Sequence, residues 1–152
     1  MTVTARLAEL GIEIPEVAKP VASYVPATVA GNLVFTAGQL PFVNGALPAT
    51  GKVGAEVSAE DAKEYARTAV LNALAAAQTA IGSVDRITRI VKLVVFVASA
   101  PEFSGQPSVA NGASDTLVEI FGDAGRHARS AVGVAVLPLD APVELELIVE
   151  FA

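Results

Sequence analysis

The sequence contains no cysteine and only one histidine in 152 residues. Without cysteine there are no disulfide bonds, thiolate zinc sites or thiol nucleophiles, and one histidine is too few for a multi-histidine metal site within one chain. The sequence also has no P-loop, no Gly-x-Gly-x-x-Gly motif and no serine-triad spacing. We therefore expect no metal and no cofactor, and covalent or nucleotide-phosphate chemistry loses support.

Charge is scarce as well. Charged residues make up 17% of the chain and hydrophobic residues 53%, a high apolar share for a soluble monomer, whose surface needs more charge. We therefore expect other copies of the chain to cover part of the apolar surface. The net charge of −6 repels phosphate backbones, so no nucleic-acid partner is expected. No apolar run approaches the ~20 residues that cross a bilayer, and the N-terminus lacks a signal-peptide pattern. We expect a cytoplasmic protein with no membrane partner.

A chain of this length fits a single domain, residues 1–152. Its first segment, residues 1–22, is predicted to be a short helix followed by an extended arm. The helix covers Thr2–Leu10 and stops at Gly11, and the arm covers Pro15–Pro20.

The rest of the chain reads as alternating strands and helices. Gly31-Asn32 lies between two short apolar runs and predicts a tight β-hairpin, and residues 42–54 read as a loop. A capping-box pattern at Ser58 opens a helix that continues to about Ile81, and its buried stripe consists mostly of alanine.

The second half adds a strand, a helix and two more strands. Ile87–Ala98 is nearly continuous and β-branched, which predicts a central strand covered on both faces. Pro107–Phe121 predicts a helix, and two strands that pair around a turn at 138–142 complete the chain. This order indicates an α+β fold, a sheet with two helices on one face. The other face must then be wet or covered by a partner, and the scarcity of charge favours a partner.

Arg129 is an unusual residue in the first of these last two strands. Period-two alternation puts it on the same side as the small residues Ala131 and Gly133, which leaves room beside its side chain. A guanidinium presents a planar fork that suits a carboxylate. The ordinary alternative is a structural salt bridge at the edge of the core.

Glu144 alternates with apolar residues in the last strand, which is typical of a solvated sheet face. If the last two strands form a hairpin, Arg129 lies opposite about Glu150 and roughly 20 Å from Glu144 along the strand. A site that uses both Arg129 and Glu144 would then lie between subunits. Alternatively, Arg129 pairs with Glu150 across the hairpin as a structural contact.

Four further residues are weaker candidates. His127 precedes the strand, where a histidine is more often a surface group than a base. Asn111, near the start of the second helix, usually serves as a local cap or turn. Gly38 ends a strand and could let a ligand approach the backbone or merely form a turn, and Tyr24 could donate its hydroxyl or simply pack.

Two motifs give the sequence a family resemblance. Ala128-Arg-Ser-Ala-Val132, running through Leu137-Pro138 to Val143-Glu-Leu-Glu146, resembles a motif of the RidA/YjgF family, also called the liver perchloric-acid-soluble protein family. Thr36-Ala-Gly-Gln-Leu-Pro41 is similar to a second family motif, and Tyr24 stands at the right distance before it. The resemblance covers most of the chain, from about Tyr24 to the C-terminus.

The resemblance implies a chorismate-mutase-like α+β fold and a homotrimer whose central barrel buries the open sheet face. It also implies ligand sites in the clefts between subunits. The implied activity is hydrolysis of reactive enamines and 2-imino acids, such as 2-aminoacrylate, to a 2-oxo acid and ammonia. Orientation, one carboxylate clamp and a placed water suffice for such hydrolysis without metal or cofactor.

The resemblance also assigns roles to residues. Arg129 would grip the carboxylate of a small metabolite, and Glu144 would orient the attacking water. Backbone groups at Gly38 and Ala131 would hold the imine and the water. The side chains of Tyr24 and Asn111 would line the cleft. The family often has serine and cysteine where this chain has Ala37 and Ala131, so the polarity of the pocket has changed.

Two other functions stay open. One is a trimer that binds or senses a small 2-oxo acid without chemistry. The other is the endoribonuclease or translation-inhibitor activity with which some members of the family are labelled. The acidic balance and the absence of a basic groove argue against RNA cleavage.

Overall fold

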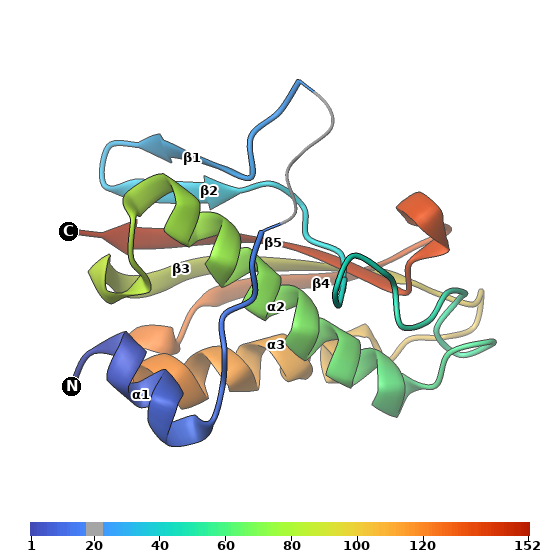
Figure 1. Cartoon of the computed structure of the whole chain (residues 1–152). Coiled ribbons are helices and arrows are strands. Elements are labelled where there is room, and N and C mark those ends of the chain that lie inside the picture. The colour runs from blue at the N-terminus through green and yellow to red at the C-terminus, as the bar shows by residue number, and fades with distance from the viewer. Residues whose placement is uncertain (18–22) are drawn as a thin grey trace.

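Three α-helices and a five-stranded mixed sheet make up most of the regular structure of residues 1–17 and 23–152, which the computed structural model describes (Figure 1). The predicted α+β class is confirmed. The elements are α1 (Val3–Leu10), β1 (Ala27–Ala30), β2 (Leu33–Thr36), α2 (Ala59–Ile81), β3 (Ile87–Ala98), α3 (Gln106–Phe121), β4 (Ala128–Val134) and β5 (Val143–Phe151).

The predicted helix boundaries hold because the local capping chemistry decides them. Thr2 caps α1 by accepting a hydrogen bond from the Ala5 amide, and the helix ends at Gly11 with φ of 66°. Ser58 caps α2 in the same way, and Gly82 ends it with φ of 90°. The predicted arm Pro15–Pro20 lies partly outside the described residues, and its described part carries no helix or strand.

The strand order is β1-β2-β5-β3-β4, so β3 lies between the last two strands of the chain. The predicted β4–β5 hairpin is therefore wrong. The helix α3 provides a crossover that sets β4 parallel to β3, and β5 then returns antiparallel on the other side of β3. Arg129 stands opposite Leu93, while Glu150 pairs with Arg89 and accepts a hydrogen bond from it at 3.3 Å. The alternative that Arg129 pairs with Glu150 as a structural contact is wrong.

The helices α2 and α3 pack side by side on one face of the sheet, as predicted (Figure 1). The alanine-rich stripe of α2 is buried and lets the helices come close. At Gly112 of α3 even a methyl group would overlap the carbonyl of Lys63. The N-terminal helix α1 packs beside α3, where the Arg6 side chain donates to the Glu119 carbonyl at 3.1 Å.

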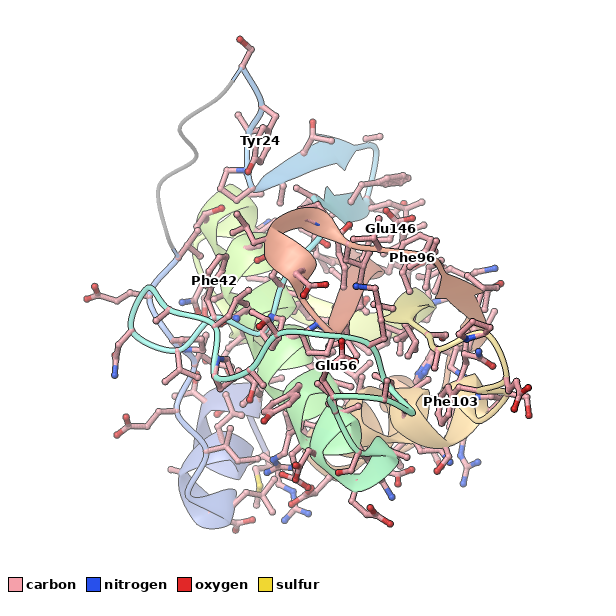
Figure 2. The ribbon with its side chains drawn as sticks, turned by 90° about the vertical axis from the view of Figure 1, so that its right-hand side faces the viewer. Tyr24, Phe42, Glu56, Phe96, Phe103 and Glu146 are labelled. Atoms are coloured by element: carbon pink, nitrogen blue, oxygen red, sulfur yellow. The ribbon has the colours of Figure 1, made fainter. Side chains whose placement is uncertain are left out.

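The opposite face of the sheet is open. Leu93, Val95 and Val97 of β3 are buried under the helices, whereas the alternating Lys92, Val94 and Phe96 are only half-buried. Figure 2 labels Phe96 and Glu146, which project from the neighbouring strands β3 and β5 on this open face. The prediction that Ile87–Ala98 is covered on both faces is wrong for the single chain. Cover by a partner stays a prediction.

Candidate functional site

Arg129 extends from β4 toward the helices. Its register partner Leu93 belongs to the buried side of the sheet, and its Nη1 donates to Asn111 Oδ1 at 2.7 Å and to Ser114 Oγ at 3.2 Å. Packing of α3 on β4 thus brings together two residues that the sequence named separately as site candidates, Arg129 and Asn111. We name these three polar residues with Ala131 the arginine half-site.

The predicted space beside Arg129 is present only in part. Ala131, two residues along β4, has a small side chain that is half-buried on the same face. At Gly133 an added Cβ would lie 2.8 Å from Gln106 Nε2 and 3.0 Å from Ser99 Oγ, so side chains close that end of the strand. Ala131 itself packs against the edge of the core, so the small side chain and not an open cavity is what the structure places beside Arg129.

Glu144 lies on the other face of the sheet. Glu144 stands opposite Phe96 on β3, whereas Arg129 stands opposite Leu93. Phe96 and Leu93 are three residues apart, and side chains at an odd spacing along a strand point to opposite faces of the sheet. The backbones of Gln39 and Leu145 exchange hydrogen bonds of 2.7 and 3.1 Å, and these bonds hold the strand of Glu144 next to Gly38. A Cβ at Gly38 would lie 2.8 Å from Glu144 Oε1, so glycine makes room for the carboxylate.

Burial alters the chemistry of this carboxyl group. The half-buried position of Glu144 raises its pKa above the usual 4.5, and the negative charge of Glu146 adds to the rise. In the described residues, Glu144 has no cation within ion-pair distance and no hydrogen-bond donor for its side chain. A carboxyl group with a raised pKa takes and returns protons more readily near neutrality.

Tyr24 lies on the same side as Glu144. The two line an open groove of about 680 Å³ with Gly38, Ala37 and residues of the β1–β2 hairpin. Tyr24 is 57% exposed, and Figure 2 shows it beside that hairpin. We name Tyr24, Gly38 and Glu144 the glutamate half-site.

One chain keeps the two half-sites apart. Arg129 and Glu144 are offset by three residues along the strand direction and by two strand spacings across the sheet. Their Cα atoms are therefore roughly 14 Å apart. Their side chains also leave opposite faces of the sheet. The sequence estimate of roughly 20 Å assumed the wrong strand pairing, but the separation within one chain remains.

Ser114 of the arginine half-site, which lies next to His127, was missed in the sequence. Its spacing of three residues from Asn111 puts both side chains on one helix face, which was the available signal. Its Oγ lies 2.9 Å from His127 Nε2, so the histidine is not a free surface group.

Among the described residues, no three acidic or histidine side chains cluster as metal ligands. None of the helices in the described part of the chain has the length and apolar character that a membrane span requires.

Comparison with known proteins finds close relatives. Residues 4–151 match the family described as "YjgF/chorismate mutase-like, putative endoribonuclease". Protein TCP17 of Trypanosoma cruzi is 44% identical over 151 residues, covering 97% of this chain and 93% of TCP17. The crystal structure of Atu1372 from Agrobacterium tumefaciens, a protein of unknown function, superposes with a TM-score of 0.91 at 44% identity, over 99% of this chain and 92% of that one.

A more distant relative of known structure is described with a bound ligand. Escherichia coli TdcF with bound serine superposes with a TM-score of 0.66 at 25% identity, over 90% of this chain and 94% of TdcF. The three similarities cover 97%, 99% and 90% of this chain, respectively.

Proposed function

The chain belongs to the YjgF/chorismate-mutase-like family, and from this premise we propose that it hydrolyses reactive 2-imino and enamine acids to 2-oxo acids and ammonia. The observation that carries the proposal is Arg129, a guanidinium on the edge strand β4 that Asn111 and Ser114 hold in place by hydrogen bonds. A cation fixed in this way suits a substrate with one small carboxylate.

The carboxylate clamp has support from a relative. TdcF is named with bound serine, an amino acid with a carboxylate of the size expected here. Both Nη1 hydrogens of Arg129 go to the protein, and among the described residues no other nitrogen of the fork donates to the protein, so these nitrogens would bind the ligand. The small Ala131 would lie next to the reacting carbon.

Glu144 would act on the water. Water adds to the carbon of the C=N bond, and Glu144 accepts a proton from that water and returns it to the nitrogen, which gives a carbinolamine. Transfer of the hydroxyl proton to the amino group then lets the C–N bond break, so that ammonia leaves and a carbonyl group forms. The raised pKa of Glu144 suits this double role, because the proton must be taken and given back in one cycle. Gly38 keeps the carboxylate accessible from the groove.

A homotrimer would join the two half-sites. We propose that the arginine half-site of one subunit meets the glutamate half-site of the next, and that the open sheet faces turn to the centre of the ring. The half-buried apolar residues of that face, such as Val94 and Phe96, favour such cover. In a cyclic trimer each interface joins one surface of a subunit to a different surface of the next subunit. Two half-sites on different surfaces of one chain can therefore meet at every interface.

The test is release of ammonia and 2-oxo acid when the protein is added to an amino-acid oxidase that generates fresh imines. Wild type should accelerate release, and Arg129→Ala should lower the acceleration at least about 100-fold, because a charged clamp is lost from the transition state. Arg126→Ala, which removes an exposed arginine outside both half-sites and outside the sheet, is the matched control. Equal rates for wild type and Arg129→Ala would contradict the clamp.

Binding without chemistry is the second candidate, since the name of TdcF records a ligand and no reaction. Tight binding of a 2-oxo acid with no acceleration of ammonia release would select it. The endoribonuclease name of the family finds no support in the net charge of −6. RNA cleavage that disappears in Arg129→Ala would reverse that judgement.

A further inference from the structure

A chain of hydrogen bonds runs behind Arg129. His127 Nδ1 lies 2.6 Å from the Gly125 carbonyl oxygen, and His127 Nε2 lies 2.9 Å from Ser114 Oγ. The same Oγ accepts from Arg129 Nη1 at 3.2 Å. The chain therefore links the buried turn at Gly125 to the guanidinium through two side chains.

The chemistry of the partners fixes the direction of each bond. A carbonyl oxygen only accepts, so Nδ1 of His127 carries a proton and donates to Gly125. In the tautomer that carries its only proton on Nδ1, Nε2 is bare and accepts the hydroxyl proton of Ser114. With its proton directed to the histidine, the Ser114 oxygen turns its lone pairs to Arg129.

This arrangement determines which edge of the guanidinium a ligand meets. An arginine offers two bidentate edges, one formed by Nη1 and Nη2 and the other by Nε and Nη2. Nη1 has two hydrogens, and Asn111 and Ser114 accept both. Within residues 1–17 and 23–152, neither Nε nor Nη2 of Arg129 donates to the protein.

We propose that His127 and Ser114 are positioning residues that hold Arg129 so that a small 2-oxo or 2-imino acid binds with its carboxylate on the Nε–Nη2 edge. The proposal rests on the carboxylate-clamp role argued above and deepens it. Neither residue touches the substrate. Their effect passes through Nη1, because a guanidinium held on one side cannot rotate to present its other edge.

Binding of pyruvate, a 2-oxo acid, measured by calorimetry tests the relay without any need for turnover. His127→Leu should weaken binding about 5- to 10-fold, because Ser114 loses the acceptor that orients its hydroxyl. His127→Gln, whose amide oxygen can replace Nε2 as acceptor, should restore most of the affinity. In a Ser114→Ala background, His127→Leu should cause no further loss.

The outcomes separate the relay from the clamp. If Arg129→Ala abolishes binding while His127→Leu binds like wild type, the relay is overturned and the clamp stands. Additive losses in the double variant also overturn the relay. If Arg129→Ala leaves pyruvate binding unchanged, the clamp fails, and the proposed function fails with it.

Nitrogen NMR of the free protein provides a readout that needs no ligand. The relay requires the neutral His127 ring to carry its proton on Nδ1, and this tautomer has a distinct pattern of nitrogen shifts. The Nη1 protons of Arg129 should exchange slowly with water in wild type and faster in His127→Leu. A ring protonated on Nε2 alone, or unchanged exchange in the variant, would overturn the proposal even if pyruvate does not bind.

Discussion

The two half-sites are built in opposite ways. In the arginine half-site, two residues of α3 hold the guanidinium by hydrogen bonds at 2.7 and 3.2 Å. In the glutamate half-site, Glu144 has no such support among the described residues, and burial followed by the negative charge of Glu146 raises its pKa. The comparison indicates that the binding group is pre-organised, while the group that must move a proton keeps its freedom.

Mixed oligomers test most strongly whether the half-sites belong to different subunits. Arg129→Ala and Glu144→Gln should each be nearly inactive. When the two variants are co-refolded in equal amounts, about a quarter of all contacts in a closed ring pair an intact Arg129 with an intact Glu144. Ammonia release should therefore return to about a quarter of the wild-type rate.

The same mixture has a clear contrary outcome. If both half-sites of one chain formed a site together, no chain in the mixture would carry both residues, and no activity would return. Separately refolded variants, mixed without subunit exchange, are the control. Recovery without exchange would mean that the variants were not inactive at the start.

Gly112→Ala should break the support of the arginine half-site by disturbing the packing of α3. The added methyl group overlaps the Lys63 carbonyl, so α2 and α3 must separate and displace the neighbouring Asn111. Overpacking of this kind costs about 1–3 kcal/mol in the free energy of unfolding. Urea unfolding measures the loss, and Asp115→Ala on the exposed side of α3 should change it by no more than about 0.5 kcal/mol. A stable Gly112→Ala protein would show that the helices have room to move.

Gly38→Ala should instead damage function with little loss of stability. Its Cβ meets the end of the Glu144 side chain, which can rotate away, and the backbone at Gly38 has no positive φ that would exclude alanine. We expect turnover to fall about tenfold, because the carboxylate leaves its position near the groove. In a Glu144→Gln background the same substitution should have no effect on the residual rate. An equal loss in both backgrounds would show that Gly38 acts independently of Glu144.

The same contrast explains how far the sequence could be interpreted. Helix ends depend on local chemistry at Ser58, Gly82 and similar positions, and their predictions hold. The pairing of β4 with β3 depends on the crossover through α3, a long-range choice that two adjacent apolar strands do not reveal. Ser114 escaped notice for the same reason, because its role exists only once α3 lies on β4.

Glu144→Gln should also change the pH dependence of stability, with the smallest effect of the series. The folded state raises the pKa of Glu144, mainly by burial, so folding is disfavoured while the carboxyl group is charged. This penalty is absent below the unfolded pKa of about 4.5 and grows as pH rises through the folded value. Glutamine carries no charge, so the variant should be more stable than wild type at pH 7 by less than about 1 kcal/mol, since solvent still reaches part of the side chain. Urea unfolding at fixed protein concentration from pH 4 to 7 measures the difference, which should shrink toward pH 4. A gain that is independent of pH would mean that glutamine stabilises by packing, and that the charge of Glu144 costs the fold nothing.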